Sequence, residues 1–407
     1  MKDFELSHDV RVLEGDEITQ AEAVFRTSMI GLPPEAEPTP EERAAGHEPG
    51  RALGVHDAGD LVGTAESYGS WLVVPGGKRV PHAAVTHVGV LPTHTRRGIV
   101  TALMRRQFED IAARGEIVAS LRASEAVIYE RFGYGVASEC ATYDVDRRRA
   151  VLRDSVPAGS PVRLADPRRL WKQWESVYEP AAWTGAIGRY EPWWRTRERW
   201  AAADTSPQYA AVTADGDGYA LYKPGDPGNW FSGDNRTIVV TDFVAHTAAA
   251  YVGLVRHLVT LDFTDTIRFL ARPVDDPLPT LFTDRRAVRK TSVRDETWLR
   301  LVDVSAALAA RRYASGPVVV VEVKDEFLPS NNGRYRIGGR PHEVARPDSS
   351  RPDLTIGAAA LASVYLGGTR WAALAQAGQV TEHRAGAVAS ADQLFSTAAA
   401  PFAGTGF

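Results

Sequence analysis

Two adjacent arginines and a glycine, Arg96-Arg97-Gly98, stand directly before a helical pattern, and this combination favours binding of an anion. The first amides of a helix have no intrahelical partner and lie at the positive end of the helix dipole. Gly98 has no Cβ to keep a phosphate away, and both guanidinium groups can pair with phosphate oxygens. The turn is no Walker loop, and a dinucleotide fingerprint needs two more glycines. It predicts a phosphate site; the alternative is an exposed arginine pair at a strand-to-helix turn.

The elements around this turn must hold it in place. Residues 85–90 alternate as a strand does, and the strand stops at Pro92, where a backbone donor is lost. After the turn, apolar residues recur at three- and four-residue spacing over 99–111, and Arg114-Gly115 follows. The sequence therefore predicts a strand, a basic turn and a helix in direct succession.

A second stretch with chemical potential follows this helix. A short apolar strand is expected at 117–121, and after it come Ser124, Glu125 and the segment Ile128-Tyr-Glu-Arg-Phe-Gly-Tyr134. Together the two stretches read VxVxPxHxRRGxxT and SExxIYxRFGYG. This combination resembles the Eis (enhanced intracellular survival) family of acetyltransferases, in the GNAT superfamily, whose pyrophosphate motif takes here the variant Arg-Arg-Gly-x-x-Thr.

The resemblance implies an α/β fold with two GNAT-like acetyltransferase domains, the second degenerate, followed by a sterol-carrier-protein-like α/β domain. We expect the catalytic domain at 1–156, the degenerate domain at 157–290 and the sterol-carrier-like domain at 291–407. The turn of the second domain, at 243–248, lacks both arginines and the glycine, so it is not expected to hold pyrophosphate. The third domain is expected to be an assembly scaffold, with an apolar lipid groove as the alternative.

Acetyl-CoA is the co-substrate that the resemblance implies, with no metal. Family members align the pantetheine arm with main-chain groups of the strand before the basic turn. Ser124 and Glu125 match further cofactor contacts, although an ordinary helix cap is an equal alternative for both. The expected cofactor-binding residues are Val88, Gly89, Val90, Arg96, Arg97, Gly98, Ile99, Val100, Thr101, Ser124 and Glu125.

Acetyl transfer to an amine needs a proton for the departing thiolate and an acceptor for the proton of the amine. Tyr129 is the expected donor, because a phenol near pKa 10 and a thiol near 8.5 are close; core packing is the alternative. The resemblance implies the α-carboxylate of the last residue, Phe407, as acceptor, acting by position, by desolvation or through a water; a frayed tail is the alternative. His82, His87 and His94 lack metal-ligand spacing and are expected to be ordinary strand and turn residues.

The expected substrate is a primary amine of a cationic small molecule, of aminoglycoside type, acetylated at one or several amines. Aminoglycoside-acetylating members carry acidic residues near the cleft, whereas this chain has Gly406 beside its terminal aromatic and Arg26 and Ser28 in its first helix. Polyamines, small arylalkylamines and protein lysine therefore stay open. The competing class is a non-catalytic acyl-CoA or lipid-binding module. The resemblance also implies a homohexamer.

The composition of the chain argues against some classes of binding partner. The chain has 407 residues, 44% hydrophobic and 24% charged, and its 47 Lys and Arg against 51 Asp and Glu give a net charge of −4. This argues against a general binder of nucleic acid or anionic membranes. The single cysteine, Cys140, excludes an intrachain disulfide and is expected to be a small buried residue. With no apolar leader or long apolar run, a cytoplasmic location is expected. The acidic segment 35–42 is expected to be a solvated loop, with a cover over a cationic substrate as the alternative.

Overall fold

The computed structural model describes residues 8–32, 38–39, 42–43, 46–167, 171–225, 236–338 and 346–407. The chain forms two compact units. Unit 1 comprises Met1–Ser138, Glu296–Pro401 and Gly406–Phe407, and unit 2 comprises Glu139–Asp295 and Phe402–Thr405. Most of the acidic segment 35–42 lies outside the described residues.

The N-terminal part of unit 1 is a twisted sheet in the strand order β1-β2-β3-β4-β5-β12. Neighbouring strands are antiparallel except β4 and β5, which are parallel. The strands are β1 (Val10–Val12), β2 (Ala52–Asp57), β3 (Asp60–Val73), β4 (Arg79–Val90), β5 (Val118–Leu121) and β12 (Val288–Leu301).

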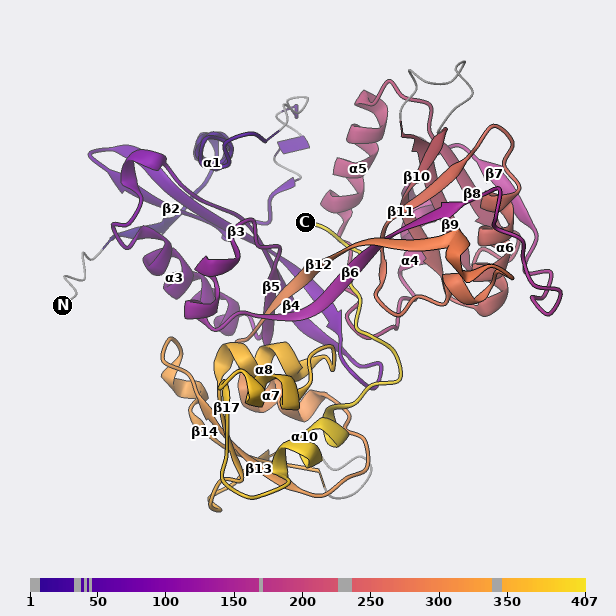
Figure 1. The fold of residues 1–407 in the computed structure, drawn as a ribbon. Helices are drawn as coiled ribbons and strands as arrows, with labels where there is room; N and C mark the ends of the chain where they lie inside the picture. Colours follow the sequence, from indigo (N-terminus) through magenta and orange to yellow (C-terminus); the bar gives the residue numbers. More distant parts are fainter. Residues whose placement is uncertain are drawn as a thin grey trace. The chain divides into compact units, whose positions relative to one another are not determined.

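Two helices cover the two faces of this sheet. The helix α1 (Asp16–Ser28) packs with Ala52 and Leu61, and the helix α3 (Ile99–Ala113) packs with Leu53 and Val62. Since adjacent residues of a strand point to opposite faces, α1 and α3 lie on opposite sides, as Figure 1 shows. The apolar residues of α3 that the periodicity identified, such as Leu103 and Phe108, are fully buried.

The structure differs from the local sequence pattern at three places. The runs 61–68 and 71–74 predict two strands, but they form one strand, β3, because Gly69 and Ser70 continue the pairing with β4. Asp16 is a plausible cap for the first helix by residue type, but the residue that caps α1 is Gly15, with no side-chain hydrogen bond. The family resemblance implies a short helix before Tyr129, but this segment consists of two 3₁₀ turns, η2 (Ala126–Ile128) and η3 (Glu130–Phe132).

The C-terminal part of unit 1 is a five-stranded sheet in the order β15-β14-β13-β16-β17 with four helices. A buried ion pair, Arg300 Nη2 to Asp325 Oδ2 at 2.6 Å, joins β12 to this part. Its elements are α7 (Val304–Ala310), β13 (Val319–Lys324), β14 (Gly333–Ile337), β15 (Arg346–Pro347), β16 (Leu354–Gly357), α8 (Ala358–Tyr365), α9 (Trp371–Gln376), β17 (Val380–Glu382) and α10 (Ala387–Phe395).

Unit 2 repeats the plan of the N-terminal sheet. Its strand order is β6-β11-β10-β9-β8-β7, in which only β10 and β11 are parallel, and α6 connects those two strands. Thr247 caps α6 by accepting a hydrogen bond from Ala250 N. The elements are β6 (Gly135–Asp146), β7 (Val162–Ala165), α4 (Trp171–Tyr178), α5 (Glu191–Ala203), β8 (Tyr209–Thr213), β9 (Gly218–Pro224), β10 (Thr237–Ala245), α6 (Ala248–Val259) and β11 (Thr266–Pro273).

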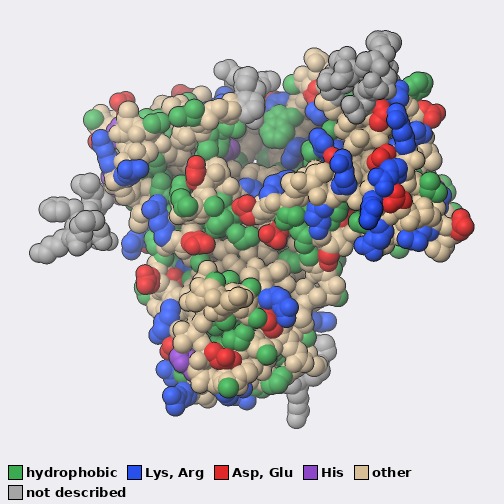
Figure 2. All heavy atoms as spheres, in the orientation of Figure 1, with side chains coloured by type: hydrophobic (Ala, Val, Ile, Leu, Met, Phe, Trp, Pro, Cys, Tyr) green, Lys and Arg blue, Asp and Glu red, His purple; other side chains and the backbone are tan. Residues whose placement is uncertain are grey.

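Surface charge, helix hydrophobicity and possible metal ligands bear on which partners the chain could bind. Figure 2 shows basic and acidic side chains interspersed on the visible face of each unit. Within the described ranges, no helix is long and apolar enough to cross a membrane, and no cluster of His, Cys, Asp and Glu is arranged to hold a metal ion. Cys140 is buried, as expected.

Candidate active site

The basic turn brings unpaired amides and positive charge to the start of α3. Gly98 adopts φ 85°, a left-handed conformation that favours glycine, and its carbonyl accepts the first intrahelical bond, from Ala102 N at 3.0 Å. The amides of Ile99, Val100 and Thr101 precede that bond and therefore have no partner within the helix. Arg96, with φ 61°, is exposed beside them. This is the geometry of an anion site.

The two arginines of the turn differ in their surroundings. Arg97 Nη1 lies 3.4 Å from Asp57 Oδ2, and Arg97 Nη2 donates to Thr93 O at 3.3 Å. Both members of the Arg97–Asp57 pair are about half exposed, so the pair adds little stability. Across the part of the chain that the structure describes, Arg96 makes no hydrogen bond or ion pair. Its guanidinium group is therefore available for a phosphate.

The strand β4 bends away from β5 just before the turn. Pairing between them ends at Ala84 with Ser120. Between Thr86 and Gly89, β4 has two residues where β3 has one, which is a β-bulge, and the bulge residue His87 has φ 50°. Beyond the bulge, none of the described strands pairs with the edge of β4 that faced β5. An extended ligand arm can hydrogen-bond there as an added strand does.

A pocket of about 420 Å³ opens at this bend. Val88, Ser124, Tyr129 and Phe407, all expected site residues, line it together. The other expected cofactor residues do not line this pocket. Gly89 packs against α1, and Val90 and Ile99 are core residues. Glu125 is exposed, and the basic turn lies outside the pocket lining. The remaining lining residues are Phe25, Met29, Ile30, Gly31, Leu32, Val85, Thr86, His87, Leu121 and Arg122.

Tyr129 lies between the two 3₁₀ turns with its side chain largely buried. It is 6% exposed, and its ring meets that of Tyr134 edge to face at 5.9 Å. A phenol is protonated at neutral pH, so the Tyr129 hydroxyl can act as a donor; burial raises the pKa of Tyr129 above its usual value near 10, which makes it a weaker acid than a free phenol. The neighbouring Tyr134 fits a core residue by sequence, with its hydroxyl on a carbonyl; it is fully buried, but its hydroxyl has no hydrogen-bond partner among the described residues.

Phe407 reaches the same pocket from the end of the chain. The Phe407 ring centroid lies 6.4 Å from the ring centroid of His82. The guanidinium carbon of Arg122 lies 5.9 Å from the same Phe407 centroid. His82 is fully buried and hydrogen-bonded to Ser120 at 2.7 Å; burial lowers the pKa of His82 to about 3, so the ring is neutral. A cationic side chain and a neutral ring thus flank the terminal aromatic residue.

A buried carboxylate beside the pocket was missed by the sequence analysis. Glu66, 3% exposed, accepts hydrogen bonds from His47 Nδ1 at 2.5 Å and from His87 Nδ1 at 2.7 Å. Burial alone would raise the pKa of Glu66, but the two histidines lower it to about 2. Burial would lower the pKa of His47, but Glu22 and Glu66 raise it to about 9. His87 is therefore more than an ordinary strand residue, because it connects the pocket to this charged cluster.

One feature of the sequence could have indicated this cluster: an acidic residue in the middle of an apolar strand. Glu66 interrupts the run from Leu61 to Tyr68, where an unpaired charge costs several kcal/mol, so a cationic or donor partner had to exist. The identity of the partners could not be inferred, because His47 and His87 lie about twenty residues away on either side.

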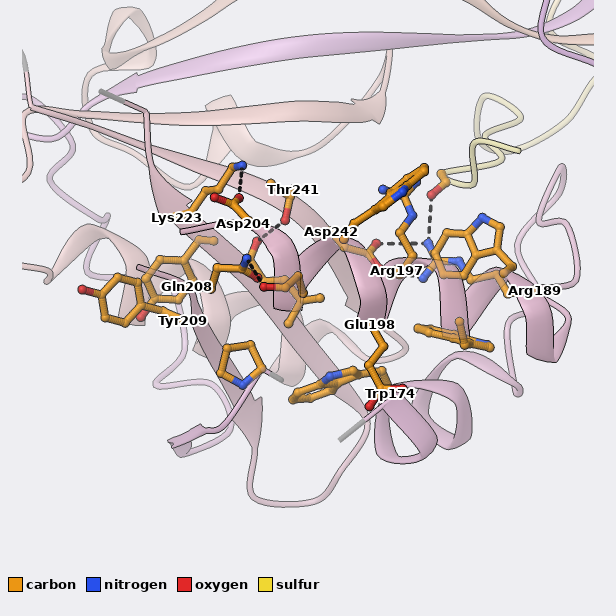
Figure 3. Close-up of a pocket in the computed structure, with 18 residues that line it drawn as sticks. Trp174, Arg189, Arg197, Glu198, Asp204, Gln208, Tyr209, Lys223, Thr241 and Asp242 are labelled. Atoms are coloured by element: carbon orange, nitrogen blue, oxygen red, sulfur yellow. Dashed lines mark hydrogen bonds and ion pairs between the residues drawn. The ribbon is translucent and has the colours of Figure 1, made fainter. Parts of the chain in front are cut away.

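Unit 2 has a pocket of its own, of about 240 Å³, between α5 and the strands β9 and β10. Its walls are rich in aromatic side chains, including Trp174 and Tyr209, and several of its charges are already paired, Lys223 with Asp204 at 2.7 Å and Arg189 with Asp242 at 2.6 Å. Figure 3 shows both pairs in the pocket.

Three family comparisons cover most of the chain. An Acetyltransferase (GNAT) domain family matches residues 9–137, a second family of the same description matches 185–301, and a Sterol carrier protein domain family matches 304–404. The expected fold class, with two acetyltransferase domains and a sterol-carrier-like domain, is confirmed.

Named relatives agree with these matches. An N-acetyltransferase Eis of Mycobacterium tuberculosis is 34% identical over 337 residues, 80% of this chain and 81% of the relative. An uncharacterized N-acetyltransferase of Streptomyces avermitilis is 38% identical over 374 residues, 88% of this chain and 89% of the relative. The crystal structure of Eis1 from Mycobacterium abscessus has a TM-score of 0.92 and 51% identity, and the match covers 98% of this chain and all of that one.

Proposed function

The chain belongs to the Eis family of N-acetyltransferases, and from this premise we propose that it transfers acetyl directly from acetyl-CoA to a primary amine of a cationic small molecule. One observation carries the proposal: Val88 beside the β4 bulge, Tyr129 and Phe407 line one pocket. These residues come from three distant parts of the sequence. A single pocket that holds a thioester-binding strand edge, a protonated phenol and a chain end has the parts that acetyl transfer needs.

The cofactor is proposed to bind along the basic turn and β4. The amides of Ile99 to Thr101 would face the pyrophosphate, with the charges of Arg96 and Arg97 beside them. The pantetheine arm would lie against the main chain of Val88, Gly89 and Val90, where β4 has left β5. Ser124 and Glu125, which follow the end of β5, are proposed to make further contacts with the cofactor. No metal is required for this chemistry.

The proposed reaction has no covalent enzyme intermediate. The neutral amine attacks the thioester carbonyl, and the carbon–sulfur bond then breaks as the amide forms. The thiolate of coenzyme A receives the proton of Tyr129, whose phenol is protonated at neutral pH. The amine loses its proton to the α-carboxylate of Phe407, directly or through a water, and the tyrosine is reprotonated from solvent.

The charge and shape of the pocket bear on the amine. The Phe407 carboxylate would favour a cationic acceptor, which supports the aminoglycoside-type substrate. The apolar lining from Phe25, Met29 and Ile30 supports a second candidate, a small arylalkylamine, whose ring would pack there. Polyamines and protein lysine would gain only the electrostatic attraction to the carboxylate.

The resemblance supports further parts of the proposal. We propose catalytic, degenerate and sterol-carrier-like domains at 1–156, 157–290 and 291–407. We also propose a homohexamer that acts in the cytoplasm, without nucleic-acid or membrane partners.

The test is thiol release from acetyl-CoA with a panel of amines that contains aminoglycosides, polyamines, arylalkylamines and a lysine peptide. Turnover with at least one class is expected, and mass spectrometry of the product would give the number of acetyl groups added. Measured acetyl-CoA binding without turnover on any amine would contradict the proposal and favour a non-catalytic acyl-CoA-binding module.

A further inference from the structure

Residues 402–405, close to the end of the chain, are hydrogen-bonded and mostly buried rather than frayed. Within unit 2, Phe402 is 6% exposed, Ala403 0% and Thr405 2%. Phe402 N donates to Thr184 O at 3.0 Å, and Trp183 Nε1 donates to Phe402 O at 2.9 Å. The tail therefore has a defined course up to Thr405.

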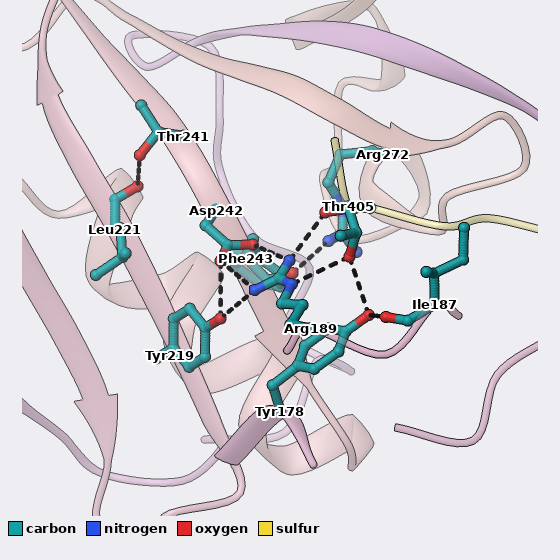
Figure 4. Close-up of polar contacts among 11 residues, drawn as sticks. Tyr178, Ile187, Arg189, Tyr219, Leu221, Thr241, Asp242, Phe243, Arg272 and Thr405 are labelled. Atoms are coloured by element: carbon teal, nitrogen blue, oxygen red, sulfur yellow. Dashed lines mark hydrogen bonds and ion pairs between the residues drawn. The ribbon is translucent and has the colours of Figure 1, made fainter. Parts of the chain in front are cut away.

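One arginine makes the central contacts to this tail. Arg189 Nη2 donates to Gly404 O at 2.9 Å, and Arg189 Nε donates to Thr405 Oγ1 at 3.0 Å. The other bonds go to Asp242, at 2.6 and 3.0 Å, and to the Tyr219 hydroxyl at 2.8 Å. These five bonds match the five N–H donors of a guanidinium group, and Figure 4 shows them converging on the arginine.

Aromatic rings and small residues complete the attachment. The Tyr178 ring centroid lies 3.9 Å from the Arg189 guanidinium carbon, and the Tyr178 hydroxyl lies 3.1 Å from Thr405 Oγ1. Gly185 has φ 92°, and a Cβ there would lie 2.8 Å from Phe402 N, so only glycine lets the tail lie this close. We call Tyr178, Trp183, Arg189 and Asp242 the tail clamp.

We propose that the tail clamp makes Arg189 a positioning residue for acetyl transfer: it fixes the chain at Thr405, two residues before Phe407, whose carboxylate is the proposed proton acceptor. The catalytic part of this inference rests on the proposed function; the attachment of the tail does not. Only Gly406 and Phe407 lie beyond the clamp, and two extended residues span at most about 7 Å. A carboxylate on so short a tether has a high effective concentration and loses little entropy on reaching the amine.

The experiment compares two clamp variants with a surface control. Thr405→Val removes the hydroxyl that accepts from Arg189 but keeps the side-chain shape, and Arg189→Lys keeps the charge but cannot reproduce five bonds. Arg195→Gln, at an exposed ion pair with Glu191, is the matched control. The first readout is independent of catalysis: release of Phe407 from the folded protein by a carboxypeptidase, followed by mass spectrometry.

Both clamp variants are expected to release Phe407 about tenfold faster than the wild type and the control, because a hydrogen bond to a charged group is lost. Their kcat should fall about tenfold, with the KM for acetyl-CoA unchanged. In a variant that lacks Phe407, added 3-phenylpropionate should restore part of the activity, since it supplies the missing carboxylate.

Three results would overturn the inference. Unchanged release of Phe407 in Thr405→Val would show that the clamp does not hold the tail. Faster release with unchanged kcat would show that holding the tail does not serve catalysis. A loss in the Arg195→Gln control equal to that in the clamp variants would remove the specific role of Arg189. If Arg189→Lys does not fold, Thr405→Val decides. If no amine is acetylated at all, the proposed function fails, while the release assay still tests the attachment.

Discussion

The buried His47–Glu66 contact predicts a specific dependence of stability on pH. The pKa of His47 is raised from 6.5 to about 9 in the folded protein. At about 1.4 kcal/mol for each pKa unit, this shift of roughly 2.5 units corresponds to about 3 kcal/mol of the free energy of unfolding. The side chain of His47 is only 13% exposed, so solvent screening reduces this figure little.

The direction follows from the sign of the shift. Because the folded pKa is higher than the unfolded one, the contribution of His47 is fully present below pH 6.5 and is lost as the pH rises through 9. The lowered pKa of Glu66, about 2, reflects partly the same contact, so the two contributions are not added. On the acid side the Glu66 contribution is present above pH 4.5 and is lost as the pH falls toward 2.

The assay is urea unfolding at a series of pH values from 6 to 9.5, for the wild type, for His47→Gln and for His383→Gln as a surface control. The wild type and the control should lose about 3 kcal/mol more than His47→Gln between pH 6.5 and 9.5. Parallel curves for the wild type and His47→Gln would refute the reasoning, because the alkaline loss would then have another source.

Four further changes have expected outcomes. Tyr129→Phe should lower kcat about 100-fold with little change in acetyl-CoA affinity measured by calorimetry; equal losses would argue against a donor role. A glycine extension after Phe407 should abolish transfer while cofactor binding persists, and full activity would remove the carboxylate from the mechanism. Gly133→Ala should cost at least about 2 kcal/mol in urea unfolding, because φ is 82° and the new Cβ would lie 2.1 Å from Arg300 Nη1. Asp325→Asn should cost about 3–5 kcal/mol in the same assay, since it leaves Arg300 charged and buried; a loss under 1 kcal/mol would contradict this.

Features encoded locally could be predicted from the sequence. The helix expected over 99–111 is α3 (Ile99–Ala113), because its apolar spacing and the preceding Gly98 are local signals. The alanine-rich run 358–365 likewise predicts a helix, and α8 (Ala358–Tyr365) has those bounds. The degenerate turn of the second domain was also readable, since the absence of arginine and glycine needs no tertiary information.

Features that depend on tertiary pairing could not be predicted. The β4 bulge exists only in register with β3, where Ala65 opposes both His87 and Val88. The tail clamp joins Arg189 to Thr405, which are 216 residues apart. No periodicity connects such residues, so the partners of Glu66 and the attachment of the tail emerged only from the folded chain.

The Arg189–Asp242 pair bears on why a domain without a pyrophosphate turn could still hold the residues that precede the chain end. A buried ion pair is weak grounds for stability, because desolvation offsets the attraction and apolar residues of the same volume often hold a fold equally well. If stability were its role, Asp242 and Tyr219 would be sufficient partners for the arginine. Two of the five donors instead reach the backbone and hydroxyl of the tail. A fully satisfied guanidinium group fixes one position of that tail and penalises others, which is what the proposed proton acceptor at the chain end would require.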